Sequence, residues 1–236
     1  DYLSGAALLA PASVWREVGG LSQYLEPMYF EDTDLSFKVR DLGYSTWFIP
    51  SSAVYHFEGM TAGTDINAGF KKYQEINRPK FKRRWANSFA SHGEEGRNPH
   101  LEKDRGIIGR VLFIDYTPPR ADKDAGSYAA LQEMKLVQSL GYKVSFVSTN
   151  MAHLGKYTHD LQQIGIEVIY APFFMNISEY LDHHATDFDA FYITRYYVAQ
   201  GVLEQIRRQA PGAKILFNNA DLHFLRELRA AQSEGD

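Results

Sequence analysis

The sequence predicts an α/β protein that contains a doubly wound parallel sheet. Short apolar segments alternate with helical or irregular stretches over the second half of the chain. Such an alternation is typical of βαβ units, in which crossovers join parallel strands. An amphipathic, acid-rich pattern before residue 85 and a polar stretch after it indicate a separate first unit. The five predicted strands of the sheet are residues 111–114, 144–147, 168–170, 191–193 and 215–217.

Composition places the chain among soluble globular proteins of one large or two ordinary domains. It has 236 residues, of which 44% are hydrophobic and 23% charged. Lys and Arg number 25 against 29 Asp and Glu, so the formal charge of −4 gives no basic field for nucleic acid. The absence of cysteine excludes disulfides and thiolate metal sites and suits a reducing cytoplasm. No apolar run approaches the roughly 20 residues of a membrane span, and no signal peptide opens the chain.

The first unit begins with an extended segment, residues 1–10, that is lined by small side chains. Gly5 and Ala6 would let either a substrate or a packed helix approach the backbone closely, and the sequence leaves both possibilities open. Further along, aromatic and β-branched residues at 46–49 and 54–57 predict two strands.

An acidic cluster opens the helix between these segments, which is predicted to end at Gly43. Leu35, Val39 and Leu42 recur at i, i+4 and i+7 and give that helix an apolar face. The helix dipole favours acids in a first turn, so capping accounts for such clusters in general. Three acids behind two aromatic residues exceed what a cap needs, and a carboxylate placed in this way is also a candidate general base. The acids are Glu31, Asp32 and Asp34, and the aromatic residues are Tyr29 and Phe30.

His56 lies in the second predicted strand of this unit. Imidazole binds divalent ions, especially beside carboxylates, but a lone histidine on a strand is also a common structural residue. Residues 68–85 are rich in Lys and Arg and are predicted to be helical. This basic run is either a phosphate clamp or membrane-surface patch, or the solvated face with one aromatic seam that such runs more often form. Residues 86–106 lack apolar periodicity and predict a linker.

The loop after the first strand of the second unit, residues 115–127, lacks the G-x-G-x-x-G pattern, which argues against NAD binding. Gly126 and Ser127 begin a helix there. Free N–H groups at a helix start suit an anionic or hydroxyl-rich ligand, with an ordinary N-cap as the alternative for Ser127. Polar residues also follow the fourth and fifth strands, at the carboxyl edge where α/β sheets bind ligands. They are Arg195, Asp221 and His223, and for the last two a cap and a loop histidine are the alternatives.

The pieces SGA, VGG, ED-x-DL, GY and V-x-H occur in this order within residues 1–85. In that order they resemble the second half of family 2 glycosyltransferases, which are inverting enzymes of the GT-A fold. The resemblance implies that Asp32 is the catalytic base and Glu31 its acidic neighbour. His56 falls where many such enzymes place a metal ligand or a diphosphate contact, and Mn²⁺ or Mg²⁺ would stabilise the departing diphosphate in the complete enzyme. Gly5, Ala6 and Asp34 would lie on the acceptor side.

The second unit resembles another glycosyltransferase family more loosely. Its pieces are D-x-GS at residues 124–127 and GY-x-V-x-F at residues 141–146, after a Pro-containing loop. Over residues 107–236 they are similar to the N-terminal, Rossmann-like domain of family 4 glycosyltransferases, which are retaining enzymes of the GT-B fold. By this resemblance the residues that contact the acceptor are Gly126, Ser127, Arg195, Asp221 and His223.

Together the two resemblances imply a tandem glycosyltransferase that is trimmed at both ends. The first unit is expected to lack its nucleotide-binding half, and the second to stop before the domain that holds the donor nucleotide. This piece alone is therefore expected to be inactive and to retain no metal. The complete enzyme would transfer sugar from a nucleotide-diphospho-sugar to a saccharide acceptor in surface-glycan synthesis, in the cytoplasm or at the inner membrane face. The alternatives are a carbohydrate-binding or scaffold module, and another α/β nucleotide-sugar enzyme such as an epimerase.

Overall fold

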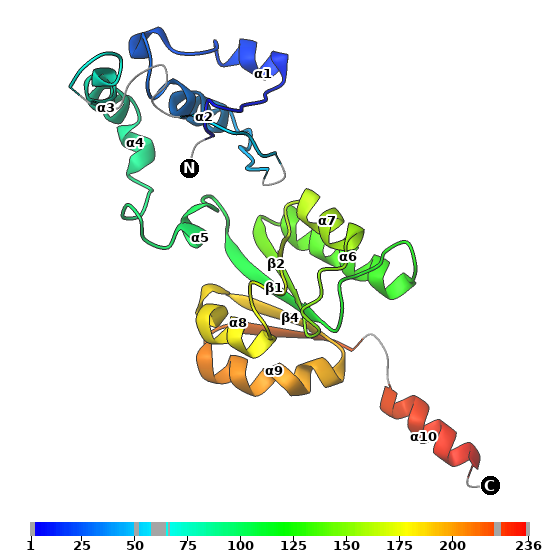
Figure 1. The fold of residues 1–236 in the computed structure, drawn as a ribbon. Coiled ribbons are helices and arrows are strands. Elements are labelled where there is room, and N and C mark those ends of the chain that lie inside the picture. Colours follow the sequence, from blue (N-terminus) through cyan, green and yellow to red (C-terminus); the bar gives the residue numbers. More distant parts are fainter. Residues whose placement is uncertain (1–2, 50–51, 58–64, 66, 220–222, 235–236) are drawn as a thin grey trace. The chain divides into compact units, whose positions relative to one another are not determined.

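The computed structural model describes residues 3–49, 52–57, 65, 67–219 and 223–234. The chain divides into two compact units, Asp1–Lys103 and Asp104–Asp236 (Figure 1). The boundary falls within the stretch that was expected to be an irregular linker. That stretch is partly helical instead, because it contains two helices of four residues each, α4 (Ala86–Phe89) and α5 (Pro99–Glu102).

The second unit contains a five-stranded sheet in which every pair of neighbouring strands is parallel. The strand order is β3-β2-β1-β4-β5, so the first strand lies in the centre, with Val111 opposite both Val144 and Ala190. Each predicted strand overlaps an observed one, and the predicted α/β fold with a doubly wound parallel sheet is confirmed. The strands are β1 (Gly109–Asp115), β2 (Tyr142–Ser148), β3 (Glu167–Ile169), β4 (Ala190–Thr194) and β5 (Lys214–Asn218).

Helices cover both faces of this sheet, with α6 and α7 on one face and α8 and α9 on the other (Figure 1). Alternate residues of β1 therefore enter two different cores. Val111 and Phe113 pack with Met134 of α6, whereas Leu112 and Ile114 lie in the cluster that includes residues of α8 and α9. Burial on both faces explains why the central strand contains the continuous apolar run of residues 111–114. The helices and the short 3-10 turn are α6 (Ala125–Ser139), α7 (Lys156–Gln163), α8 (Ile177–His184), η2 (Ala185–Asp187), α9 (Tyr196–Gln209) and α10 (His223–Glu234).

The regular elements described in the first unit are all helices, and the unit has a small, mainly aromatic core. Phe37 packs against Phe81 and Trp85, with ring centroids 5.3 and 5.2 Å away. Leu25 and these three side chains are buried together, which joins three separate elements of the chain. Besides α4 and α5, the elements are α1 (Ala12–Glu17), η1 (Gln23–Leu25), α2 (Glu31–Asp41) and α3 (Lys72–Arg84).

The strands predicted for the first unit are not present among its described residues. Residues 3–10, 44–49 and 52–57 form no strand, although much of their sequence is apolar. Phe48 and Tyr55 remain 80% and 96% exposed. A strand needs a hydrogen-bonded neighbour, and the described residues of this unit offer none to these segments.

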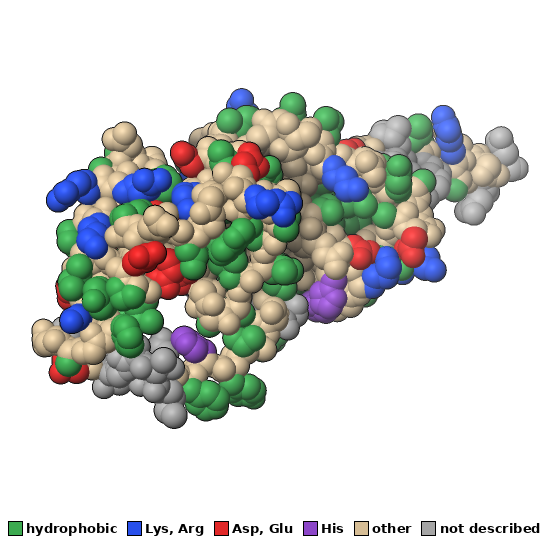
Figure 2. Space-filling view, turned by 90° about the horizontal axis from the view of Figure 1, so that it is seen from above, with side chains coloured by type: hydrophobic (Ala, Val, Ile, Leu, Met, Phe, Trp, Pro, Cys, Tyr) green, Lys and Arg blue, Asp and Glu red, His purple; other side chains and the backbone are tan. Residues whose placement is uncertain are grey.

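The predicted apolar face of α2 also differs from the observed one. Leu35 is buried as expected, but Leu42 is 46% exposed, and the buried residues run consecutively from Asp34 to Phe37. In α3 the basic side chains are largely exposed and the buried residues are Asn77 and Phe81, so this helix has a solvated basic face and a narrow buried seam. Figure 2 shows Lys and Arg side chains dispersed among acidic and apolar ones on the face in view.

Candidate functional site

The acidic cluster lies at the start of α2, directly after an unusual backbone turn. Tyr29 and Phe30 both have φ of 72°, a left-handed conformation that non-glycine residues seldom adopt. No side chain caps the helix at Phe30. Strained residues of this kind persist only where the surrounding structure holds them, and they are common at functional sites. The turn places Glu31 and Asp32 in the first turn of the helix, ahead of its buried part.

Three donors orient the carboxylate of Asp32. The Gly5 N–H donates to Oδ2 at 2.8 Å, and the N–H and hydroxyl of Thr33 donate to Oδ1 at 2.7 and 3.2 Å. A carboxylate offers roughly four lone-pair positions, so this one can accept a further hydrogen bond. Asp32 is only partly buried, which leaves it accessible. The carboxylate is therefore held in one orientation and has spare acceptor capacity, both of which a general base requires.

The predicted acceptor-side residues Gly5 and Ala6 lie in a turn against this carboxylate. A Cβ on Gly5 would lie 3.4 Å from both Cβ and Oδ2 of Asp32, so the absence of a side chain permits the close approach. Both residues are exposed, and the Ala6 N–H donates to the Ser4 hydroxyl at 3.3 Å. Their contact with an acceptor stays a prediction, whereas the contact of Gly5 with Asp32 is a feature of the structure.

Glu31 has a different environment from its neighbour. Its Oε2 atom is buried and has no hydrogen-bond partner among the described residues. Burial raises the pKa of Glu31 above its ordinary value, and the adjacent charge of Asp32 adds to this rise, although backbone hydrogen bonds oppose it. Two adjacent carboxyl groups thus have unlike surroundings, an arrangement that separates acid from base roles in enzymes.

Asp34 has a structural place instead of the predicted contact with an acceptor. Its side chain is fully buried, and it accepts hydrogen bonds from the Ser22 hydroxyl at 2.6 Å, the Tyr24 hydroxyl at 2.5 Å and Trp85 Nε1 at 2.8 Å. Lys38 and Arg84 add positive charge 3.8 and 3.6 Å away. The carboxylate therefore joins η1, α2 and the end of α3, and no surface remains on it for a ligand.

His56 lies on the exposed segment 52–57. Among the described residues, no group of three or more potential metal ligands includes it. The described surroundings therefore do not make a metal site of His56, and its role as a metal ligand or diphosphate contact stays a prediction.

A second candidate region lies at the carboxyl edge of the parallel sheet. The chain runs from β1 to β2 on one side and reaches β4 on the other, so β1 and β4 flank the point where ligands bind in open α/β sheets. Asp115 ends β1 and Arg195 follows β4, and Arg195 Nε donates to Asp115 Oδ1 at 2.8 Å. Arg195 has a φ of 75°, which is a second strained position.

The electrostatics of this pair are those of a partly buried site. Burial raises the pKa of Asp115, and the Tyr116 N–H and Arg195 offset part of that rise. Two exposed tyrosines follow the pair in the chain: Tyr116 comes directly after Asp115, and Tyr197 two residues after Arg195. Their rings pack edge-on, with centroids 6.0 Å apart. Sequence reasoning found Arg195 but missed Asp115, for which an acid directly after an apolar strand was the available signal.

The remaining predicted residues of the second unit are arranged less favourably for ligand binding. Asp124 is the N-cap of α6: it accepts from the Ser127 N–H at 2.7 Å and from the Ser127 hydroxyl at 2.8 Å. The Ser127 amide is thus already used, and Ser127 is not itself the cap. Gly126 is exposed. Asp221 lies outside the described residues, and His223 begins α10 with a side chain that also lies outside them.

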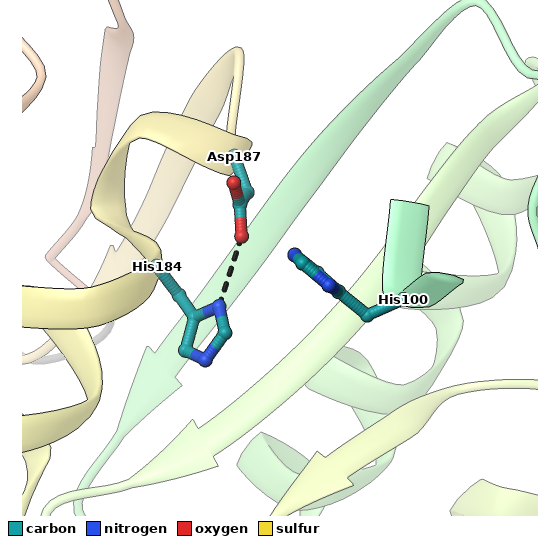
Figure 3. A group of neighbouring side chains, drawn as sticks. All are labelled: His100, His184 and Asp187. Carbon is teal, nitrogen blue, oxygen red and sulfur yellow. Dashed lines mark hydrogen bonds and ion pairs between the residues drawn. The ribbon is translucent and has the colours of Figure 1, made fainter. Parts of the chain in front are cut away.

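His184 and Asp187 form a hydrogen bond of 2.9 Å between the end of α8 and η2 (Figure 3). The ring of His184 also stacks on Tyr180 at 5.0 Å. This pair precedes β4, whereas the Asp115–Arg195 pair lies at the opposite, carboxyl end of the same strand. It therefore lies away from the candidate ligand edge.

Comparisons with known proteins add no family assignment. No protein-family model matches the chain, and no curated protein or solved structure matches it either. In the part of the chain that the structure describes, no helix combines the length and the apolar character that crossing a membrane requires.

Proposed function

We propose that this chain is part of a glycosyltransferase in which Asp32 is the general base. The observation that carries the proposal is the state of the Asp32 carboxylate: three donors fix its orientation, and it is accessible with acceptor capacity left. In the proposed reaction an acceptor hydroxyl donates a hydrogen bond to Asp32. Its oxygen bonds to the anomeric carbon of a nucleotide-diphospho-sugar, its proton passes to Asp32, and the nucleoside diphosphate leaves from the opposite face with inversion.

Glu31 supports this assignment through its contrast with Asp32. Because its pKa is raised by burial, Glu31 keeps its proton to a higher pH than an exposed glutamic acid does. In the proposed reaction the accessible Asp32 takes the proton, and the more buried Glu31 does not. A divalent cation on the diphosphate belongs to the proposal for the complete enzyme. The described residues give it no ligand set around His56, so the proposed steps use only side chains of this chain.

For the second unit we propose the binding of a hydroxyl-rich acceptor at the carboxyl edge of the sheet. Arg195 and Asp115 supply paired charges with donor and acceptor groups, and Tyr116 and Tyr197 supply exposed ring faces beside them. Sugars present hydroxyl groups together with apolar C–H faces, and this combination of groups suits both. The arrangement also suits a carbohydrate-binding module without chemistry, which is the competing proposal for the chain as a whole.

A turnover assay on the full-length gene product separates the two proposals. Nucleoside diphosphate release is measured with UDP-, GDP- and dTDP-sugars, Mn²⁺ and a panel of saccharide acceptors. The transferase proposal expects release that depends on the acceptor and is lost in Asp32→Asn. Asp41→Asn is the matched control, because Asp41 is an exposed acid at the other end of the same helix. Binding of saccharides without any release, or equal release by Asp32→Asn and wild type, would support the binding module instead.

A further inference from the structure

One buried asparagine of α3 contacts the turn that precedes the acidic pair. Asn77 is fully buried, although it lies on a helix whose other polar residues are mostly exposed. Its Nδ2 donates to the carbonyl oxygens of Leu25 at 2.6 Å and Met28 at 2.8 Å, and lies 3.5 Å from that of Tyr29. Its Oδ1 accepts from Lys80 Nζ at 2.9 Å. Every polar atom of the side chain is therefore used.

The turn that Asn77 contacts is the one with the left-handed residues. Tyr29 and Phe30 stand immediately before Glu31, and neither their conformation nor the start of α2 is stabilised by a side-chain cap at Phe30. The contact comes from a residue 48 to 52 positions later in the chain. A buried carbonyl that loses its donor is costly, so these hydrogen bonds favour one backbone path through the turn.

We propose that Asn77 is a positioning residue for the proposed glycosyl transfer: it holds the turn at residues 25–29 so that Glu31 and Asp32 face the reacting groups. This inference rests on the function proposed above. An amide is the side chain that the position requires, because it donates twice toward carbonyl oxygens while its own oxygen accepts from Lys80. An aspartate would direct oxygen at oxygen, and a leucine would fill the space without donating.

The rest of the buried seam of α3 acts on the same region. Phe81 follows Asn77 by four residues and its ring stacks on that of Phe30, with centroids 5.3 Å apart. Trp85, the residue directly after α3, follows by four more and donates to Asp34. Residues spaced by four lie on one face of a helix. In succession, Asn77 contacts the turn, Phe81 contacts Phe30, and Trp85 contacts the buried part of α2. Asn77 is the member of this seam that reaches the backbone of the turn.

Hydrogen exchange on the 236-residue chain tests whether Asn77 holds the turn, and it needs no enzymatic activity. In Asn77→Ala, peptides that cover residues 25–32 should exchange about tenfold faster, because two buried hydrogen bonds that oppose opening are lost. Exchange in the strands of the second unit should stay unchanged. Asn87→Ala, which removes an exposed asparagine of α4, is the matched control. Unchanged exchange at residues 25–32 would overturn the inference whatever the enzyme assay shows.

Turnover of the full-length enzyme tests the positioning role. We expect kcat of Asn77→Ala to fall by about 10²-fold with little change in the KM for the sugar nucleotide, since misplacement of a catalytic group by about 1 Å has effects of that size. Asn77→Leu, which keeps the volume, should behave in the same way and replaces the alanine variant if that variant does not fold. If Asp32→Asn abolishes transfer but both Asn77 variants turn over within threefold of wild type, the positioning inference is overturned. If wild type transfers no sugar, the proposed function fails and this inference with it.

Discussion

Replacement of Asp34 should weaken the first unit more than any other single change in the acidic cluster. Three neutral donors and two cations surround its fully buried carboxylate. In Asp34→Ala the donors of Tyr24 and Trp85 lose their acceptor, and each buried group left unsatisfied costs ~1–3 kcal/mol. Lys38, whose side chain is 12% exposed, also loses its counter-charge. We therefore expect the free energy of unfolding of this unit to fall by about 4 kcal/mol.

Asp34→Asn separates the charge from the hydrogen bonds. An amide oxygen can keep the bonds of Tyr24 and Trp85, and the amide nitrogen can donate to the Ser22 hydroxyl. Only the charge is then lost, and a hydrogen bond to a charged group exceeds a neutral one by about 1 kcal/mol. We expect a loss of about 1–2 kcal/mol, clearly smaller than in the alanine variant.

Denaturant unfolding followed by tryptophan fluorescence measures the stability loss of both Asp34 variants in the first unit. All three tryptophans of the chain, Trp15, Trp47 and Trp85, lie in the first unit, so the signal does not report the second. Asp41→Asn, at an exposed position of the same helix, should stay within about 0.5 kcal/mol of wild type. An Asp34→Ala chain that unfolds within 1 kcal/mol of wild type would show that this network does not hold the unit together.

Three further predictions concern the candidate sites themselves. The pKa of Glu31 is raised in the folded state, so the free energy of unfolding falls as the pH rises from the ordinary pKa of 4.5 through the folded-state pKa. Glu31→Gln removes this loss and should raise the denaturation midpoint of the first unit at pH 7. Below pH 4.5 the substitution should have no such effect. Equal effects at both pH values would contradict this. Arg195→Gln should raise the pKa of Asp115 further, since Arg195 lowers it now, and should weaken saccharide binding; carboxyl NMR titration and calorimetry measure the two. If the proposed transferase function holds, Asp32→Asn should lower kcat by ~10²–10⁴-fold, and the midpoint should fall only slightly, because the lost hydrogen bond from Gly5 is exposed. Turnover within threefold of wild type would remove Asp32 from the proposed mechanism.

The second unit was predictable from sequence because its local pattern and its tertiary surroundings agree. The middle of β1 is a continuous apolar run, with Val111 and Phe113 in one core and Leu112 and Ile114 in the other. Each strand pairs with one or two neighbouring strands of the same sheet. The strand-forming sequence and the available hydrogen-bond partners therefore lead to the same structure.

The first unit was less predictable because distant residues decide its local structure. Residues 46–49 have the composition of a strand, but strand propensity measures how well side chains pack on neighbouring strands, and the described residues supply no neighbour. The burial of Asp34 depends on Trp85, which lies 51 positions away. No pattern within α2 reveals that an acid in its first turn faces the core. The position of Asp32 at a helix start is a local property and was predictable, whereas its role as a base rests on the family resemblance and stays a prediction.

The spacing of the three acids explains how one short helix start can serve both folding and chemistry. Asp34 lies two residues after Asp32, about 200° around a helix of 3.6 residues per turn, so the two carboxylates point in nearly opposite directions. One direction leads into the network of Ser22, Tyr24 and Trp85, and the other to the Gly5 loop and the surface. A rigidly held acid on the inner side therefore fixes the orientation of the accessible one. A general base must be held within hydrogen-bond reach of its proton, and this geometry would supply that constraint to the proposed base from within the same turn of helix.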